Sequence, residues 1–358
     1  MDEQNLFKQT YKGKKVFLTG HTGFKGSWLL LWLHSLGAEI KGYALEPQTE
    51  KDLYRLINGD SLCISVIADI RDREKLKQEI ISFQPDYVFH LAAQPLVRLS
   101  YQIPVETFDT NVMGTANLLD TLRFLDKSCN TVLITTDKVY ENVERDYHYK
   151  ETDRLGGHDP YSASKAAAEI VISSYRNSFF NNKDFYYHKK AIAVARAGNV
   201  IGGGDRARDR IIPDIITALE NKEEVVIRNP NAVRPWQHVL EPLFGYLLLG
   251  MKLSEDHQVF SDVWNFGPEY TDILKVSALV SIALQCWGMD KYQTPELADQ
   301  PHEAGLLHLD ITKAKDILSW RPKFNSAQAI NKTMDWYRNA APDYHSYTLQ
   351  QIKEYMDS

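Results

Sequence analysis

Short apolar runs alternate with helical patterns over the first 200 residues of this chain. Such alternation is typical of repeated strand–helix–strand units, whose parallel strands are covered by helices on both faces of the sheet. The sequence therefore predicts an α/β protein built on a doubly wound parallel sheet of Rossmann type. The runs predicted to be strands are Lys15–Thr19, Glu39–Leu45, Leu62–Ile70, Asp86–Ala92, Thr131–Thr136 and Ala191–Gly198. The predicted helices between them include Arg73–Phe83, Val105–Phe124 and Tyr161–Phe180.

The alternation weakens after Gly202, which indicates a second and smaller unit. We expect residues 12–200 to form the Rossmann domain, with segments near 230–265 returning to it. Residues 201–229 and 266–358 are expected to form a smaller α/β domain that binds the substrate. Within this part we predict helices over Ile211–Glu220, Val239–Lys252 and Val276–Trp287, and an extended segment over Val225–Arg228.

Composition excludes several classes of protein. The 41 basic and 47 acidic side chains give a net charge of −6, whereas nucleic-acid binding favours a basic face. The polar N-terminus lacks the apolar core of a signal peptide, and no apolar run approaches the ~20 residues of a membrane span. We therefore expect a soluble, cytoplasmic protein with no nucleic-acid or membrane partner.

The three cysteines predict neither disulfides nor a metal site. Cys63, Cys129 and Cys286 lie far apart, and no Cys or His pattern has the spacing of zinc ligands. Reduced, buried thiols are the simplest interpretation in a cytosolic protein.

A glycine-rich turn joins the first predicted strand to the helix that follows it. Glycines let the backbone turn sharply and approach a pyrophosphate, while the helix N-terminus supplies N–H donors and a positive dipole end. The spacing is GxxGxxG rather than GxGxxG, and glycine turns also serve packing alone, but the strand–turn–helix context favours a dinucleotide site. The residues predicted to bind the cofactor here are Gly20, Thr22, Gly23, Phe24, Lys25 and Gly26.

The choice between NAD and NADP depends on the end of the second strand. An acidic residue there usually binds the ribose hydroxyls of NAD. The nearest acid, Glu46, lies slightly beyond the expected place, and no arginine stands beside it in the sequence to bind a 2′-phosphate. This pattern favours NAD modestly. Asp69 and Ile70, which close the third strand, are candidate adenine contacts, although Asp69 is equally explained as a helix cap.

Tyr161 and Lys165 form the second motif. Residues four apart share a helix face, so the phenol and the ammonium group can both face a nicotinamide ring. A nearby cation lowers the pKa of a tyrosine, which makes the phenolate a usable base. The alternative is a surface pair of no function, but Asp159-Pro160 before it and the glycine turn upstream argue against chance.

Together these motifs resemble the extended short-chain dehydrogenase/reductase superfamily. Its nucleotide-sugar branch is matched by HLAAQ (90–94), TN (110–111), TTDKVY (135–140), RAGNV (196–200), RPWQH (234–238) and NFG (265–267). Within that branch TGHTGFKGSW, AAQPLVRLSY, TTDKVYEN and RAGNVIGGGD resemble the CDP-glucose 4,6-dehydratases. The resemblance runs from about Lys14 to Lys323 and implies NAD as cofactor and a CDP-sugar as substrate.

The resemblance also implies site residues outside the two motifs. Cofactor contacts are expected from Leu91, Ala92, Ala93 and Asn111 as well as from Tyr161 and Lys165. Substrate contacts are expected from Gln94, Arg98, Asn199, Val200, Arg234, His238 and Asn265.

Thr136, Asp137 and Lys138 distinguish a dehydratase from an epimerase within this branch. Epimerases need only the hydroxyl and the tyrosine, whereas a 4,6-dehydratase also needs an acid and a base to eliminate water. The dTDP-glucose and GDP-mannose enzymes carry Asp-Glu, and Lys138 is a departure that the CDP-glucose enzymes share. A lysine held near other positive charges can lose its proton and act as the base. The alternative for Lys138 is a solvated charge at the end of the strand.

Two other functions stay open at this point. One is a nucleotide-sugar epimerase or a dehydratase of another sugar. The other is a non-catalytic NAD-sensing protein, against which the presence of Thr136, Tyr161 and Lys165 together argues.

A homodimer, or a dimer of dimers, is expected from the resemblance and from two helices. Val105–Phe124 and Tyr161–Phe180 carry apolar residues on more than one face, and such helices need a second partner besides their own sheet. The alternative is that the smaller domain covers them. The residues that suggest the second partner are Val112, Met113, Leu118, Leu119, Ile170, Val171 and Ile172.

Overall fold

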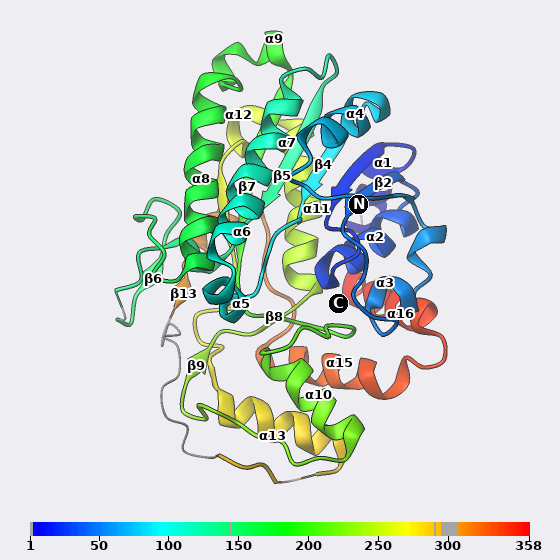
Figure 1. Ribbon diagram of the computed structural model, residues 1–358, viewed down its shortest axis with the longest axis vertical. Coiled ribbons are helices and arrows are strands. Elements are labelled where there is room, and N and C mark those ends of the chain that lie inside the picture. The colour runs from blue at the N-terminus through cyan, green and yellow to red at the C-terminus, as the bar shows by residue number, and fades with distance from the viewer. Residues whose placement is uncertain (1–2, 144, 290, 295–306) are drawn as a thin grey trace.

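The apolar runs form a seven-stranded parallel sheet in the computed structural model, which describes residues 3–143, 145–289, 291–294 and 307–358 (Figure 1). The strand order is β3-β2-β1-β4-β5-β7-β11, and every neighbouring pair is parallel. The predicted Rossmann-type sheet is therefore confirmed. The strands are β1 (Lys15–Thr19), β2 (Glu39–Ala44), β3 (Ile64–Ile67), β4 (Tyr87–His90), β5 (Cys129–Ile134), β7 (Lys190–Ala197) and β11 (Val263–Phe266).

Two predicted extended segments differ from the structure. The predicted strand Leu62–Ile70 is reduced to the four residues of β3, because this edge strand pairs on one side only and leaves Ile64 and Ile67 exposed. Val225–Arg228 forms no strand; Val226 takes part only in an isolated β-bridge, with Gln293.

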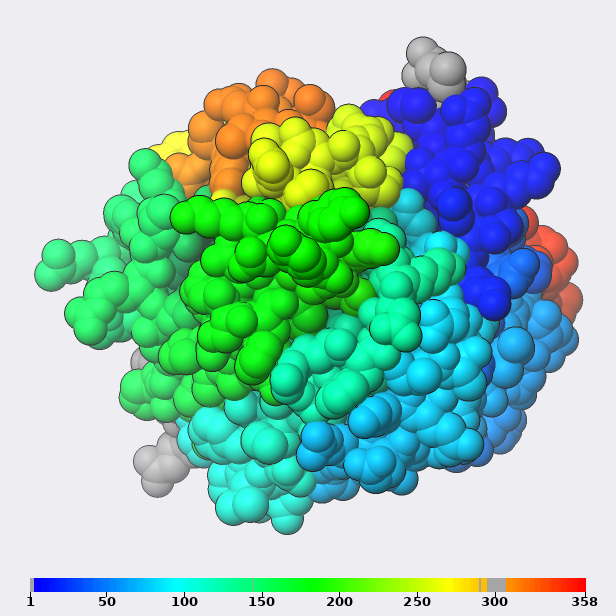
Figure 2. Space-filling model, turned by 90° about the horizontal axis from the view of Figure 1, so that it is seen from above, coloured from blue at the N-terminus to red at the C-terminus, as the bar shows by residue number. Residues whose placement is uncertain are grey.

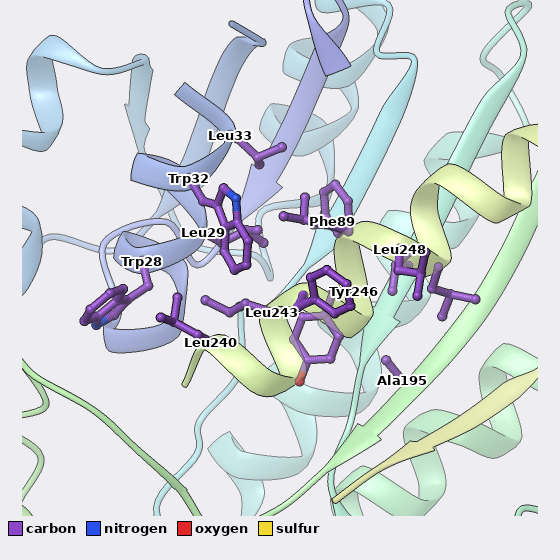
Figure 3. Close-up of a cluster of buried hydrophobic side chains, with 14 of the residues drawn as sticks. Trp28, Leu29, Trp32, Leu33, Phe89, Ala195, Leu240, Leu243, Tyr246 and Leu248 are labelled. Carbon is purple, nitrogen blue, oxygen red and sulfur yellow. The ribbon is translucent and has the colours of Figure 1, made fainter. Parts of the chain in front are cut away.

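Helices cover both faces of the sheet, as the sequence predicts. On one face α2 (Phe24–Ser35) and α11 (Leu240–Glu255) pack against the sheet and contribute to the cluster drawn in Figure 3, which includes Trp28, Trp32, Leu243 and Phe89. On the other face α4 (Arg73–Phe83), α7 (Gly114–Leu122) and α8 (Pro160–Ser178) bury a second cluster. Alternate residues of the central strands β1, β4, β5 and β7 enter the two clusters, which is the arrangement of a sheet buried on both sides.

The predicted helix Val105–Phe124 is interrupted by one π-helical turn. It consists of α6 (Pro104–Phe108), the π turn Asp109–Met113 and α7. Leu118 and Leu119, and Ile172 of α8, are buried against their own sheet, so these three residues do not indicate a second partner. Met113 and Ile170 are exposed.

Segments after Gly202 form a third cluster below the sheet in the view of Figure 1. It is made by α10 (Ile211–Asn221), α13 (Val276–Trp287) and α15 (Ser326–Asn339), whereas β11 returns to the main sheet beside β7. The exact division into two domains stays a prediction. The remaining strands are β6 (His148–Tyr149), β8 (Val200–Ile201), β9 (Val233–Arg234), β10 (Gln237–His238), β12 (Leu274–Lys275) and β13 (His308–Leu309). The remaining helices are α1 (Glu3–Tyr11), α3 (Leu53–Leu56), α5 (Val97–Gln102), α9 (Phe185–His188), α12 (His257–Phe260), α14 (Thr312–Asp316) and α16 (Tyr344–Met356), with 3₁₀ turns at Gly59–Ser61, Asp137–Val139 and Asn182–Asp184.

The two chain ends pack on the same face of the sheet. The buried aromatic side chains of α1 and α16 join the α2–α11 cluster, and Figure 2 shows the blue N-terminal segment beside the yellow segment that includes α12.

All three cysteines are free thiols, but Cys63 and Cys286 are partly exposed, so the prediction of buried thiols holds for Cys129 alone. In the described parts of the chain, no helix is both long and apolar enough to cross a membrane.

Glu241 of α11 is a buried carboxyl that fastens the C-terminal part of the chain. It accepts hydrogen bonds from the backbone N–H groups of Lys323 (3.1 Å) and Phe324 (2.7 Å) and from the hydroxyl of Tyr355 (2.7 Å). Burial raises the pKa of Glu241 from 4.5 to about 7. Near neutral pH, therefore, the folded chain retains a proton that the unfolded chain has already released.

We expect the Glu241 carboxyl to make the protein less stable as the pH rises. Between about 4.5 and 7 the folded state binds more protons than the unfolded state, so the free energy of unfolding falls with increasing pH. Glu241→Gln, which stays neutral, should flatten this part of the dependence. Urea denaturation at pH 5 and pH 8 measures the difference in each protein. An equal pH dependence in both would show that Glu241 does not titrate in this range.

Candidate active site

The glycine-rich turn leaves one glycine facing open space. Gly20 has a φ of +75°, and a Cβ there would lie 2.8 Å from the amide nitrogen of Ala92. A Cβ at Gly26 would overlap the carbonyl of Gly20. At Gly23, by contrast, a Cβ would meet only that carbonyl oxygen, at an ordinary 3.5 Å, and φ is −77°. Backbone geometry and packing thus require glycine at positions 20 and 26. At Gly23 the fold would accommodate a side chain, so the glycine there leaves space beside the turn that the protein itself does not fill.

The end of β2 carries an ion pair that the sequence did not predict. The hydroxyl of Thr22 donates to the carbonyl of Leu45 (2.8 Å) and joins the glycine turn to this strand end. Helix α3 brings Arg55 beside Glu46, with Nη2 3.0 Å from the carboxylate. The sequence has no arginine next to Glu46, but the structure brings one to this place from a later helix. Its charge is matched by Glu46.

The end of β3 is also occupied by an ion pair. The Arg71 guanidinium lies 2.6 Å from the Asp69 carboxylate and lowers the pKa of that carboxyl through its hydrogen bonds. Ile70 is buried in the second core cluster, next to Gly114. The Ile70 side chain is thus used in packing, and an adenine contact from this residue stays a prediction.

The segment after β4 is held close to the glycine turn. The hydroxyl of Thr19 accepts hydrogen bonds from the N–H groups of Leu91 and Ala92, both at 3.1 Å. Asn111, at the π turn, accepts from the N–H of Gln94 (2.8 Å) and donates to the hydroxyl of Ser164 (2.8 Å). These contacts hold the half-buried segment from Leu91 through Ala93 to Gln94 between β1 and α8.

The Gln94 side chain is used within its own loop. Its amide nitrogen donates to the hydroxyl of Thr107 (2.9 Å) and the carbonyl of Leu96 (3.1 Å), and its oxygen accepts from the N–H of Leu96 (2.6 Å). In this arrangement Gln94 shapes the loop, and both amide hydrogens already have partners.

Thr136, Asp137 and Tyr161 meet at the end of β5. The Thr136 hydroxyl donates to Asp137 Oδ1 (2.9 Å) and also forms a hydrogen bond with Tyr161. Asp137 is buried directly under Gly198, where any side chain would overlap its carboxyl group. Lys138 follows as a half-buried residue whose N–H donates to Thr136 Oγ1 (3.4 Å).

The tyrosine and the lysine of the YxxxK motif lie on one face of α8, as predicted. Lys165 is buried and donates from Nζ to the carbonyl of Ile134 (3.0 Å). Burial lowers the pKa of Lys165 to about 8, and the negative charge of Glu169 opposes this change.

The pKa of Tyr161 differs from the expectation. We expected Lys165 to lower it, but burial raises it to about 12, while the hydrogen bond with Thr136 and the charge of Arg210 act in the opposite direction. The ammonium group of Lys165 is engaged with the Ile134 carbonyl instead of the phenol. With so high a pKa, the phenol is neutral at pH 7.

Lys25 adds a cation to this group from the start of α2. Burial lowers the pKa of Lys25 to about 7, and repulsion from Lys165 and Arg210 contributes to this shift to a smaller extent. The negative charge of Asp137 raises the pKa and so opposes the shift. The glycine turn thus carries a titratable amine to the Asp137–Lys165 region. The neighbouring Phe24 ring lies beside Gly202.

Four other predicted substrate residues lie on α5, on β9 and on the segment that follows β7. Asn199, with a φ of 51°, follows β7, and Val200 begins β8. Arg98 of α5 lies 3.6 Å from Asp209. Arg234 lies on β9, where its backbone pairs with Leu274.

Two other predicted substrate residues prove to be packing residues. His238 is fully buried, with its ring between those of Trp28 and Phe324. Asn265 is also fully buried, and its Nδ2 donates to the carbonyls of Tyr149 (2.9 Å) and Asp310 (3.1 Å). Neither side chain has an exposed face in this structure, so a substrate contact from either residue stays a prediction.

Sequence reasoning missed three charged residues near the site. Arg210 pairs with Asp205 (3.0 Å), and its charge acts on both Tyr161 and Lys25. Glu169 and Arg196 form a buried ion pair behind Thr135. The signals were present, since Glu169 is four residues after Lys165 and Arg196 opens the RAGNV segment. Across the described residues, no three His, Cys, Asp or Glu side chains are grouped as metal ligands would be.

These residues suit a dinucleotide cofactor. The cleared surface at Gly23, the N-terminus of α2 and the nearby Lys25 match the needs of a pyrophosphate. The tyrosine–lysine pair and the hydroxyl of Thr136 lie together at the ends of the strands, where ligands of open α/β sheets bind. Fold and site together define a dehydratase or epimerase of the extended short-chain dehydrogenase/reductase class.

Comparison with known proteins narrows this class. The family described as GDP-mannose 4,6 dehydratase matches residues 17–333, and the chain belongs to this family. A curated relative, the CDP-glucose 4,6-dehydratase of Salmonella typhimurium, is 46% identical over 353 residues, which are 98% of both chains.

Solved structures with lower sequence identity share the fold. The dTDP-glucose 4,6-dehydratase from Streptomyces venezuelae, solved with NAD bound, has a TM-score of 0.77 at 24% identity and covers 91% of this chain and 98% of its own. The UDP-glucose 4-epimerase from Thermotoga maritima, solved with UDP-glucose, has a TM-score of 0.76 at 22% identity and covers 91% of this chain and 99% of its own.

Proposed function

We propose that this chain is an NAD-dependent CDP-glucose 4,6-dehydratase, which converts CDP-D-glucose to CDP-4-dehydro-6-deoxy-D-glucose and water. The observation that carries the proposal is the 46% identity to the Salmonella typhimurium CDP-glucose 4,6-dehydratase over 98% of both chains. The grouping of Thr136, Asp137 and Tyr161 at the end of β5 supports it, because these groups supply the required acid–base chemistry.

Tyr161, Thr136 and Lys165 serve oxidation at C4 in this proposal. Bound NAD would supply the acceptor, and later the donor, of a hydride. Tyr161 removes the proton of the sugar 4-hydroxyl, and Thr136 holds the same oxygen by a hydrogen bond. The pKa of the phenol must fall from about 12 for this role. The positive charges of Lys165 and of an oxidised nicotinamide both act in that direction.

Asp137 and Lys138 serve the elimination. A keto group at C4 acidifies the proton at C5, which Lys138 removes, while Asp137 protonates the departing 6-hydroxyl, which leaves as water. The C5–C6 double bond formed in this way is then reduced: a proton returns to C5, and the hydride that bound NAD would hold completes the methyl group at C6. The buried place of Asp137 under Gly198 suits an acid that must be shielded from bulk water. Lys138, which is half-buried at the start of the next turn, suits a group that reaches a substrate entering from outside.

The substrate diphosphate requires cationic partners near the strand ends. We propose Arg234 and Arg98 for this role, with Asn199 and Val200 beside the nucleotide-sugar, as the resemblance implies. Arg210 is added because its charge reaches both Tyr161 and Lys25.

The decisive experiment presents four nucleotide sugars to the purified protein in the presence of NAD. CDP-glucose, dTDP-glucose, UDP-glucose and GDP-mannose are incubated separately, and 4-keto-6-deoxy products are detected by their absorbance in alkali and by mass spectrometry. We expect a product 18 Da lighter than its substrate from CDP-glucose. A product of unchanged mass, epimerised at C4, would instead indicate an epimerase. A dehydrated product from another nucleotide sugar alone would contradict the choice of base.

The chain is further proposed to be a cytoplasmic homodimer. NAD and nucleotide sugars are cytoplasmic metabolites, and the product would serve the synthesis of deoxysugars such as those of O-antigens. Val105, Met113 and Ile170 are 75%, 50% and 62% exposed on the outer faces of α6, the π turn and α8. Pairing these helices with a second copy would cover the three side chains and form a four-helix interface.

Light scattering at micromolar protein should therefore give about twice the monomer mass of 41.1 kDa. Ile170→Glu, which places a charge on the helix face that a second copy would cover, should return the mass to that of a monomer. Tyr187→Glu, on the highly exposed α9, is the matched control and should leave the dimer intact. A monomeric wild-type chain would contradict the dimer.

A further inference from the structure

A buried ion pair lies directly behind the reaction site. Glu169 is four residues after Lys165 on α8, so the two side chains share a helix face. Its Oε1 accepts hydrogen bonds from Arg196 Nε (2.8 Å) and from the hydroxyl of Thr135 (2.6 Å). Both charged side chains of the Glu169–Arg196 pair are only 3% exposed. The carboxylate thus connects β7 and the end of β5 to the helix that carries Tyr161.

The hydrogen-bond network continues through Arg196. Its Nη1 donates to the hydroxyl of Tyr140 (2.6 Å), which in turn donates to Asn265 Oδ1 (2.8 Å). The guanidinium therefore has protein partners on several sides, and Glu169 is its carboxylate partner. None of these four side chains takes part in the proposed reaction. Through its hydrogen bond with Thr135, Glu169 connects this network to the residue that precedes Thr136 in the chain.

The charges around Lys165 differ in their effect on its ammonium group. Glu169 favours the charged form of Lys165, and the charge of Lys165 in turn lowers the pKa of Lys25 on α2. His90 faces it from β4 and is uncharged, because burial and the charge of Lys165 lower its pKa to about 3. Arg196, from β7, is neutralised by the same carboxylate. Glu169 is thus placed to keep a buried amine protonated.

We propose that Glu169 is a positioning residue of the reaction site, which keeps Lys165 positively charged and, through Thr135, holds Thr136 in place. This inference rests on the proposed function, since it assigns a purpose to Lys165 and Thr136 in that reaction. The physical basis is that a carboxylate one helical turn away, shielded from water, stabilises the cation far more than an exposed one would.

The pH profile of turnover separates this role from a structural one. With a pKa of about 8, Lys165 loses its charge on the alkaline side of neutrality, and loss of the Glu169 charge should move this step to lower pH. In Glu169→Gln we expect the alkaline limb of kcat to shift by at least one pH unit. The ratio of variant to wild-type activity should then be at least about sevenfold lower at pH 9 than at pH 6.5. Loss by one constant factor at every pH would mean a structural role and would overturn the proposal.

Further variants keep the test decisive if an unpaired Arg196 prevents folding. The double variant Glu169→Gln/Arg196→Gln leaves neither member of the ion pair unpaired, and it should keep the alkaline shift because Glu169, and not Arg196, raises the pKa of Lys165. Glu169→Asp, which retains the charge, should restore the wild-type limb. Glu241→Gln is the matched control, because Glu241 is an equally buried glutamate bound to backbone N–H groups away from Lys165, and it should leave the limb in place.

A second measurement does not depend on turnover. Competitive labelling with acetic anhydride at a series of pH values, read at Lys165 by peptide mass spectrometry, follows the neutral amine directly. We expect the labelling curve of Glu169→Gln to lie at lower pH than that of wild type. Coincident curves would overturn the proposal. If the wild-type chain dehydrates no nucleotide sugar, the proposed function fails while this comparison still tests the effect of Glu169 on Lys165.

Discussion

Tyr161→Phe should fold normally and lose at least ~10²-fold in turnover, the lower range for a missing acid–base group. The substitution removes the hydroxyl that takes the substrate proton and keeps the ring that packs at the start of α8. The expected loss is in kcat, because the hydroxyl acts on the reacting oxygen and not on the nucleotide. Steady-state kinetics with CDP-glucose measures it, and thermal denaturation checks the fold.

Tyr11→Phe is the matched control for this substitution. Tyr11 is also buried, and its hydroxyl donates to the carbonyl of Leu247 (2.6 Å) in the middle of α11. Removal of the Tyr11 hydroxyl should lower the stability of the protein, since a buried hydrogen bond is lost. It should leave kcat unchanged. A Tyr161→Phe enzyme that works within a few-fold of wild type would assign the base to another group.

Gly23→Val should abolish NAD binding without unfolding the protein. The structure leaves room for a side chain at this position, and the φ of −77° is accessible to valine, so the substitution obstructs a ligand and not the fold. Titration calorimetry with NAD measures binding, and the melting temperature should stay near that of wild type. Because the expected effect is steric, Gly23→Ala should weaken binding less than Gly23→Val.

Gly26→Val provides the contrast, since its side chain would overlap the carbonyl of Gly20 and should destabilise the turn itself. The same titrations with NADP test the cofactor preference, and we expect weaker binding because Glu46 occupies the guanidinium of Arg55. Undiminished NAD affinity in Gly23→Val would mean that the pyrophosphate does not approach this turn.

Local patterns in the sequence determined the sheet, the glycine turn and the YxxxK helix. Strand and helix periodicity depends on neighbouring residues, and the helix prediction Arg73–Phe83 agrees with α4 at both ends. Thr136, Asp137 and Lys138 could be found because they directly follow a buried strand, and Tyr161 and Lys165 because they are one helical turn apart. Where a functional group is fixed by its own strand or helix, sequence reasoning is sufficient.

Tertiary structure decided which polar side chains face the site and which serve packing. Asn265 and His238 stand in segments typical of the family, yet the first is saturated by partners more than forty residues away and the second lies between two aromatic rings. Arg55 reaches Glu46 only because α3 folds back over the end of β2. The Glu169–Arg196 pair joins α8 to β7, and its burial sets the charge balance at Lys165. Burial and long-range pairing depend on residues far apart in the chain, so local patterns in one sequence do not contain them.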